Sequence, residues 1–161
     1  MKKIFAMLLA VLMLTALCGC GGKQNSGPEP GTPLSTFYQA ILDAQPEDAE
    51  PLILFEESYP DLIASLYPGL DGIELNQQVF YLPPIITFPC EIVMVEVKNS
   101  EDVEAVVEIF RARIAAGAAE TFYADSAAGW QKYAQVQQSG NFVCMIVLPE
   151  GYVIPENVFA A

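Results

Sequence analysis

Histidine is absent from the 161-residue sequence. It is the commonest general base near neutral pH and the commonest protein ligand of transition metals. Its absence argues against a serine or cysteine nucleophile of the catalytic-triad type, which needs a histidine base. It also argues against most transition-metal centres. We therefore predict that the protein is not an enzyme, that it has no catalytic residues, and that it holds no metal and no cofactor.

Positive charge is also scarce. The sequence has 7 Lys and Arg residues against 20 Asp and Glu residues, and its formal net charge is −13. Nucleic-acid binding needs a basic surface that neutralises phosphates, so this balance argues against nucleic acid as a partner. Strong acidity fits simple solubility and also fits recognition of a basic partner, and charge alone does not choose between them.

The N-terminus carries a long apolar run. Lys2 and Lys3 precede uninterrupted apolar residues from Ile4 to Leu14, and Thr-Ala-Leu-Cys-Gly-Cys follows at 15–20. This is the layout of a secretory signal peptide. Extended through Thr15 to Leu17, the apolar stretch is 14 residues, shorter than the roughly 20 of a membrane-spanning helix, which argues against an uncleaved anchor. Residues 15–20 resemble the lipobox at which a bacterial signal peptidase cuts before a lipid-bearing cysteine.

Two cysteines compete for that lipid. Leu17 precedes Cys18 and is too large for the usual cleavage position, whereas the small Gly19 precedes Cys20. We therefore predict a signal peptide over residues 1–19 and lipid attachment at Cys20. Two long acyl chains give stable attachment, so the mature protein is expected on the outer face of the cytoplasmic membrane.

The chain after the signal peptide divides into a tether and a domain. Residues 20–33 are predicted to form a lipidated flexible tether, because GGKQNSGPEPGTP offers no apolar side chain to bury. Residues 34–161 are predicted to form one domain. Removing 19 residues from 161 leaves 142, enough to bury one core. Losing Lys2 and Lys3 leaves 5 basic residues against 20 acidic ones, a formal charge of −15.

Hydrophobic periodicity predicts an α+β fold. Helices are expected at 34–44, 60–67, 100–117 and 127–135, and strands at 73–82, 90–97 and 142–148. The strand CEIVMVEV at 90–97 is largely apolar on both faces, which is typical of a strand covered on both sides. We predict a small, largely antiparallel central sheet of about three or four strands packed by helices in a single domain.

The domain has two cysteines, Cys90 and Cys144, in apolar strand-like runs. An exported protein can form disulfides, and neighbouring strands can bring two cysteines together. Free cysteine is also among the most buried residue types. Both a disulfide and two reduced core cysteines therefore fit the sequence.

Glu91 is a candidate for a structural ion pair. It shares one face of its strand with Val93 and Val95, where a buried carboxylate needs a charged or hydrogen-bonding partner. Arg111 or Arg113 on the following helix can supply that partner.

Three aromatic residues form a candidate ligand groove. Tyr123, Trp130 and Tyr133 lie in a short segment rich in small residues. Aromatic side chains most often belong to a core, but Trp and Tyr are enriched at binding surfaces and loosely built segments often carry function. We therefore expect any groove to involve these three side chains.

The stretch from Tyr59 to Leu148 resembles a family of mostly Gram-positive bacterial lipoproteins, the domain of unknown function 4358. The likeness rests on LYPGLDG, then EIVMVEVKNSEDVEAVVEIFRARI, then a tyrosine at Tyr123, then QVQQSGNFVCMIV. In that family a glutamate opens the central strand, here Glu91, and an arginine ends the helix, here Arg113. A Gly-aromatic-Val step opens the last strand, and Asn141 interrupts that step here. The resemblance implies an α+β domain on the cell envelope and transfers no catalytic residue.

Three functional hypotheses follow from these observations. The first is a non-enzymatic module that binds an envelope protein, with the membrane as a second partner through the lipid. The second is a small-ligand-binding accessory lipoprotein of a transporter, which requires a concave pocket. The third is a carboxylate-based hydrolase, which requires two acidic groups converging in a cleft about 5 to 10 Å apart.

Overall fold

The computed structural model describes residues 27–85 and 88–160. The predicted signal peptide and the Cys20 lipid site lie outside these residues. Among the described helices, none combines the length and the apolar character that a bilayer crossing requires.

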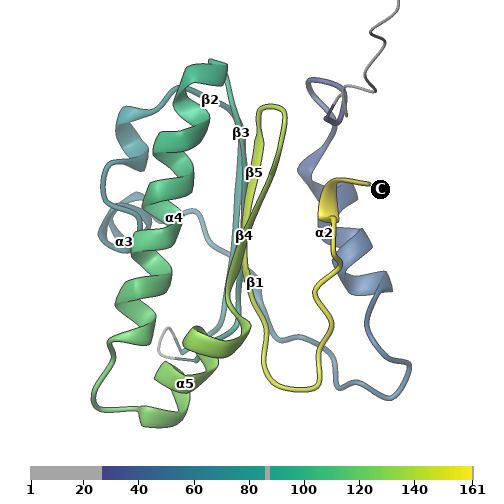
Figure 1. Cartoon of the computed structure of the whole chain (residues 1–161), viewed down its shortest axis with the longest axis vertical. Helices are drawn as coiled ribbons and strands as arrows, with labels where there is room; N and C mark the ends of the chain where they lie inside the picture. Colours follow the sequence, from purple (N-terminus) through teal and green to yellow (C-terminus); the bar gives the residue numbers. More distant parts are fainter. Residues whose placement is uncertain (1–26, 86–87, 161) are drawn as a thin grey trace, which may run out of the picture.

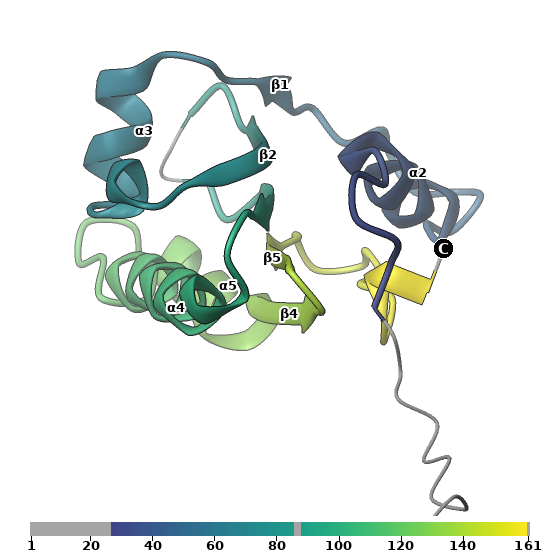
Figure 2. The same cartoon turned by 90° about the horizontal axis from the view of Figure 1, so that it is seen from above.

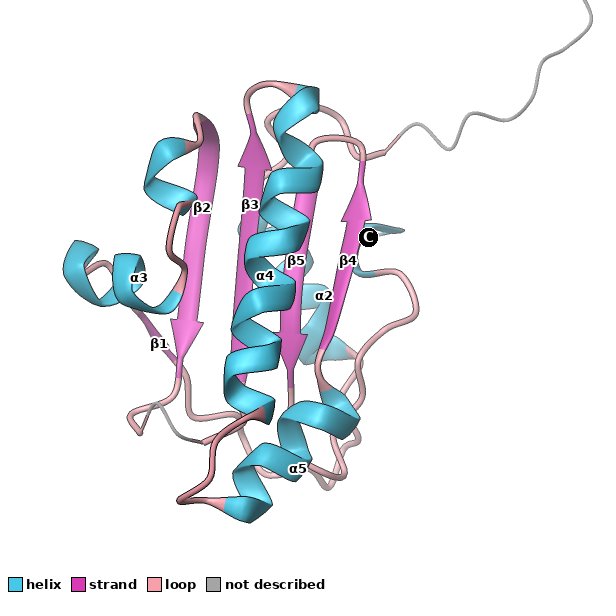
Figure 3. Ribbon diagram, turned by 60° about the vertical axis from the view of Figure 1, so that its left-hand side comes forward, coloured by secondary structure: helices cyan, strands magenta, loops and turns pink. Residues whose placement is uncertain are grey.

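The protein is built on an open antiparallel sheet (Figure 3). Its strands are β1 (Phe55–Glu56), β2 (Leu75–Leu82), β3 (Glu91–Val97), β4 (Gln135–Ser139) and β5 (Phe142–Val147). They lie in the order β1-β2-β3-β5-β4, and every neighbouring pair is antiparallel. The predicted α+β class is confirmed. The described sheet has five strands instead of three or four, because β1 and β4 extend its two edges.

Helices cover the sheet on both faces, giving three layers (Figures 1 and 2). The helices are α2 (Leu34–Asp43), α3 (Pro60–Leu66), α4 (Val103–Ala118) and α5 (Ala124–Tyr133). Short 3-10 turns occupy Leu70–Gly72, Ser100–Asp102 and Val158–Ala160. The first face carries α3, α4 and α5, and the second carries α2 and the C-terminal segment.

Strand β3 connects the two cores because its side chains alternate between the faces. Val93 and Val95 join the cluster under α4, whereas Ile92 and Met94 join the cluster under α2. Every residue of β3 is buried. The predicted central position of this strand is confirmed, and burial on both faces explains its nearly continuous apolar sequence.

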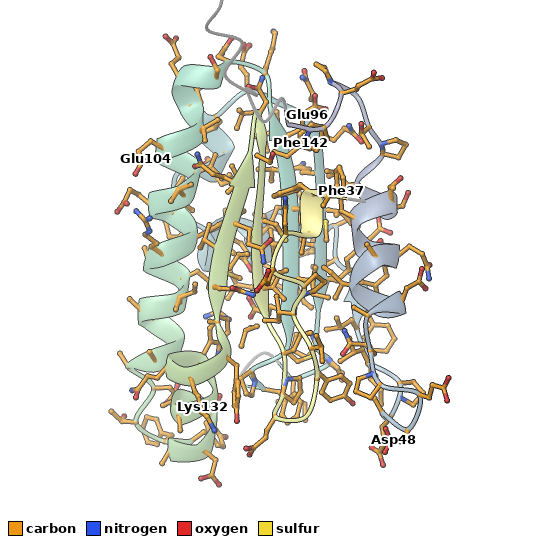
Figure 4. The ribbon with its side chains drawn as sticks, turned by 45° about the vertical axis from the view of Figure 1, so that its right-hand side comes forward. Phe37, Asp48, Glu96, Glu104, Lys132 and Phe142 are labelled. Carbon is orange, nitrogen blue, oxygen red and sulfur yellow. The ribbon has the colours of Figure 1, made fainter. Side chains whose placement is uncertain are left out.

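Helix α2 is held on the second face by a small group of aromatic contacts (Figure 4). Phe37 packs edge-on against Phe142 of β5, with ring centroids 5.4 Å apart, and against Phe159 at 5.0 Å. Leu34 and Ile41 are buried on the same side of the helix. The C-terminal segment thereby closes the layer that α2 begins.

Gly117 is the second-last residue of α4, so the predicted end of this helix is right to within one residue. A Cβ atom at Gly117 would lie 2.3 Å from the Trp130 ring. The missing side chain therefore allows the indole of α5 to pack directly on α4.

Part of the predicted tether is in contact with the sheet, which corrects the boundary at residue 33. The Gly31 amide donates a hydrogen bond to the Glu96 carboxylate at 3.0 Å, and the Gln77 side chain donates to the Thr32 carbonyl at 3.0 Å. A Cβ atom at Gly27 would lie 2.7 Å from the backbone nitrogen of Gly140, in the β4–β5 turn. Backbone groups, not apolar side chains, make these contacts, so apolar content alone did not reveal them.

Cys90 and Cys144 are free thiols in the described structure. Cys144 pairs with Met94 across β3 and β5, and Met94 is four residues from Cys90. At roughly 3.3 Å per residue, this register separates the cysteines by about 13 Å, beyond the roughly 7 Å that a disulfide spans.

Candidate functional site

A large open groove lies at one end of the sheet, where β2 and β5 end and β3 begins. It has a volume of about 1120 Å³. Its lining residues come from four segments: 50–53, 83–90, 122–133 and 149–152. Residues 86 and 87 of the second segment are not described. These segments are far apart in sequence and meet because antiparallel strands bring their ends to a common edge. Helix α5 lies at this end of the molecule (Figure 1).

Exposed apolar side chains dominate the groove. Phe122 is 90% exposed, and Phe88 and Tyr123 are more than half exposed. Ile53 and Ile85 are also exposed and add aliphatic surface. Large apolar side chains gathered around one concavity, as opposed to scattered singly, make this groove the candidate binding surface.

Proline forms much of the groove's backbone. The lining includes Pro51, Pro83, Pro84, Pro89 and Pro149. Each proline has a fixed φ and offers no backbone N–H. The backbone is therefore restricted at these five positions, which offer rings and carbonyl groups and no N–H donor.

A polar group lies at the α5 side of the groove. The Lys132 ammonium is 3.5 Å from the Glu150 carboxylate and 4.8 Å from the centroid of the Tyr133 ring. Hydrogen bonding with Tyr133, and then the charge of Lys132, lower the pKa of Glu150. Glu150 thus stays ionised to lower pH than an ordinary glutamate, which does not suit a general acid.

The structure brings together two of the three aromatic residues predicted for a groove. Tyr123 and Tyr133 line the concavity. Trp130 does not: it is 2% exposed, and its ring stacks under the Arg113 guanidinium with 4.5 Å from Cζ to the ring centroid. Trp130 belongs to the core because it faces α4, whereas Tyr123 and Tyr133 lie at the two ends of α5.

A buried ionic cluster lies under α4. Arg113 makes two contacts with Glu91: its Nη2 donates to Oε1, and its Nε donates to Oε2 at 3.2 Å. The Tyr67 hydroxyl donates to the same Oε2 at 2.8 Å. Glu91 is fully buried and Arg113 is 9% exposed. Of the two predicted partners, the structure places Arg113 against Glu91.

Arg111 lies elsewhere, on the exposed side of α4, where it pairs with Glu104 and Glu108. The reason is helical geometry. Residues three apart share a helix face, so Arg113 lies on the same buried face as Phe110. Arg111 is the next residue after Phe110 and points about 100° away from it.

Burial and charge shape the ionisation of this cluster. Burial, followed by the charge and hydrogen bond of Glu91, raises the pKa of Tyr67 well above its ordinary value. Burial alone would lower the pKa of Arg113, but hydrogen bonding and charge from Glu91 outweigh it and raise that pKa. The cluster is thus a closed structural network, and no buried side-chain nitrogen or oxygen in the described residues lacks a partner.

The described residues contain no group of three or more acidic or cysteine side chains placed to hold a metal ion. The carboxylates that line the groove belong to Glu50, Asp125 and Glu150. Of these, Glu150 is paired with Lys132.

Sequence reasoning missed much of the groove. Phe88 and Phe122 are aromatic and conspicuous, but isolated aromatic residues more often pack in a core. Ile85 directly follows Pro83-Pro84, and Ile53 lies two residues after Pro51. Prolines close to apolar residues are the signal that could have found these two positions. Such a cluster cannot continue a helix or a central strand, so it places apolar residues in loops.

The fold and the groove define a class: a three-layer α+β protein with an open antiparallel sheet and an apolar groove at one sheet end. Residues 62–148 match the family described as domain of unknown function (DUF4358), and the chain belongs to that family. The matched region runs from α3 to the end of β5, so α2 and the C-terminal segment lie outside it. The groove combines lining residues from inside and outside that region.

No curated protein and no solved structure shows significant similarity to the chain.

Proposed function

We propose that this chain is a lipoprotein held on the outer face of the cytoplasmic membrane by lipid on Cys20, and that it works as a non-enzymatic binding module in a Gram-positive envelope. The observation that carries the proposal is the groove with its exposed aromatic and aliphatic rim. Exposed apolar clusters are costly in a protein that binds nothing, since they promote non-specific association.

Two observations favour binding over catalysis. The sequence has no histidine, so acid and base chemistry would fall to carboxylates. The pKa of the groove carboxylate Glu150 is lowered, whereas a carboxylate-based hydrolase needs one carboxyl group with a raised pKa. These points support the binding role against a hydrolase.

Capture of a small ligand for a transporter is the second candidate, and the concavity of the groove favours it. Small-molecule pockets typically enclose about 300–1,000 Å³ and bury most of their ligand. This groove is open and has about 1120 Å³. An open apolar surface of this size suits a macromolecular partner better than an enclosed small molecule.

Photo-crosslinking in intact cells tests the proposal. A photoreactive phenylalanine analogue is placed at position 122 in the groove and, as the matched control, at position 59. Tyr59 is 62% exposed and does not line the groove. A Cys20→Ala chain tests dependence on the anchor.

We expect one envelope protein to be captured from position 122, not from position 59, and less in the Cys20→Ala chain. Equal capture from both positions would contradict a groove-directed binding role. A small-molecule adduct at position 122, with no protein adduct at either position, would favour the transporter alternative.

A further inference from the structure

We propose that the groove binds an extended polypeptide segment in which apolar side chains alternate with lysine or arginine. This inference rests on the proposed binding function and specifies the chemistry of its partner. It follows from four features: the groove's apolar rim, its proline walls, its charge, and its position relative to the anchor segment.

The apolar part of the partner follows from the rim. Phe122, Phe88 and Tyr123 are each more than half exposed around one concavity. Covering such rings removes apolar surface from water, which is favourable by about 25 cal/mol per Å² before the costs of association. Aliphatic or proline side chains of a partner would fill the space between these rings.

The extended form of the partner follows from the walls. Loops with five lining prolines lose little conformational freedom on binding, so the groove is largely preformed. Aromatic and proline surfaces of this kind fit peptides that already favour an extended conformation. Three loops and helix α5 border the opening, and its volume of about 1120 Å³ exceeds what a single side chain needs.

The positive charge of the partner follows from complementarity. The charged residues lining the groove are Glu50, Asp125 and Glu150 against Lys132 alone. Lys132 is paired with Glu150. No described ion pair neutralises Glu50 or Asp125. The formal charge of the whole chain has the same sign, so a cationic segment is attracted and an anionic one is repelled.

A protein fits this position better than a lipid surface. Gly27 and Gly31 contact the sheet end at the β4–β5 turn and the end of β3, near Glu96. Figure 4 shows Glu96 at the opposite end of the molecule from Lys132, which lines the groove. Strand β3 alone separates the two ends by about 20 Å. A domain anchored through Cys20 therefore presents the groove away from its own membrane, and its negative charge repels anionic headgroups.

Binding of designed peptides to the soluble chain 21–161 tests the proposal, since this chain contains every described residue and both cores. The probe is a fluorescent peptide of alternating lysine, leucine and proline, followed by anisotropy. Two matched peptides replace lysine by glutamate, or leucine by serine. Vesicles of phosphatidylglycerol form a separate arm.

We expect the lysine–leucine–proline peptide to bind at least about tenfold more tightly than either matched peptide, and more weakly as salt increases. Phe122→Ser should weaken binding about tenfold or more, whereas Tyr59→Ser, on an exposed aromatic outside the groove, should not. Combined Glu50→Gln and Asp125→Asn should reduce the preference for lysine over glutamate. Circular dichroism of each variant confirms that it is folded.

Several results would overturn the inference. Equal binding of the lysine and glutamate peptides through Phe122 would reject the cationic partner and leave the binding module intact. Binding of vesicles that is lost in Phe122→Ser would replace the polypeptide by a lipid surface. If no peptide binds while crosslinking from position 122 still captures an envelope protein, the peptide chemistry is wrong and the proposed function stands.

Discussion

Arg113 joins several elements of the fold around α4. Its guanidinium donates to both carboxylate oxygens of Glu91 and lies over the face of Trp130. Tyr67 completes the cluster from the segment after α3. One side chain therefore joins β3, α4, α5 and the α3 region, and a buried carboxylate is matched by charge and by geometry.

Replacing Glu91 by glutamine removes the negative charge and leaves the Arg113 guanidinium buried without a counter-ion. Breaking a buried ion pair typically costs about 3–5 kcal/mol, so we expect Glu91→Gln to lower the free energy of unfolding by about 3 kcal/mol. Urea denaturation of chain 21–161 measures the effect. The matched control is Glu108→Gln, at the exposed pair with Arg111, where the change should stay within about 0.5 kcal/mol. Equal effects for the two variants would contradict a structural role for the buried pair.

Both thiols of the domain should be unreactive in the folded protein. Cys90 is 3% exposed and burial, then the charge of Glu91, raises its pKa to about 12. Burial also raises the pKa of Cys144. At about pH 8 we expect no reaction of chain 21–161 with a thiol reagent, and reaction of both cysteines in denaturant. A missing thiol in denaturant would reveal a disulfide and contradict the register of β3 and β5.

The raised thiol pKa values also set a direction for stability at alkaline pH. In the unfolded chain a thiol loses its proton from about pH 8.5, whereas Cys90 in the folded chain keeps it until about pH 12. Between these values the unfolded state binds fewer protons, so the free energy of unfolding falls as pH rises. The contribution of Cys90 to the free energy of unfolding is therefore fully present below about pH 8.5 and is lost as the pH approaches about 12.

At the scale of elements, the sequence predicted the interior of the fold better than its edges. The helices at 34–44 and 60–67 and the strands at 90–97 and 142–148 lie within a residue or two of α2, α3, β3 and β5. Each has a continuous apolar run or an apolar stripe, because burial determines its composition.

The edge strands were not predicted, for a physical reason. β4 reads QVQQS and is half-exposed, and β1 has two exposed residues. Neither has the periodicity that burial produces. Their pairing with β5 and β2 comes from the hydrogen-bonding edge of an existing sheet, which is information that a local pattern does not contain.

The α4–α5 contact gives a prediction for Gly117. In an open helix, Gly→Ala is stabilising by up to about 1 kcal/mol, because alanine has the higher helix propensity. Here the new Cβ would lie 2.3 Å from the Trp130 ring, so we expect Gly117→Ala to destabilise by about 1–3 kcal/mol. Gly72→Ala is the control, since no atom lies within 4 Å of a Cβ there. A gain of stability in Gly117→Ala, measured by urea denaturation, would show that α5 is not packed this closely.

At the scale of the whole molecule, the two ends of the sheet carry different features. The end near Glu96 receives the segment that leads from the predicted lipid site. The opposite end carries the groove. The sequence predicted a segment before the domain but not its contacts with the sheet. It predicted two tyrosines of the groove but not the loops that line the rest of it. The groove forms where three loops and helix α5, which are distant in sequence, meet, so only the topology reveals it.

The N-terminal contact can be tested through Gly31. Glu96 is 1% exposed and accepts hydrogen bonds from the Gly31 amide and the Gln77 side chain. In Glu96→Ala the Gly31 amide loses its acceptor, and we expect its hydrogen exchange, measured by NMR, to accelerate by about tenfold or more. Glu104→Ala, at an exposed acid on α4, should leave Gly31 unchanged. Unaltered exchange in Glu96→Ala would mean that the segment is held by other contacts.

The position of Trp130 has a practical consequence. The sequence contains a single tryptophan, and its ring is enclosed by Arg113 and by the surface that Gly117 leaves open. Its emission therefore comes from one defined environment, and the guanidinium above the ring leaves when α4 and α5 separate. The intrinsic fluorescence of the unlabelled chain thus provides an optical reporter of that separation, free of any background from a second indole.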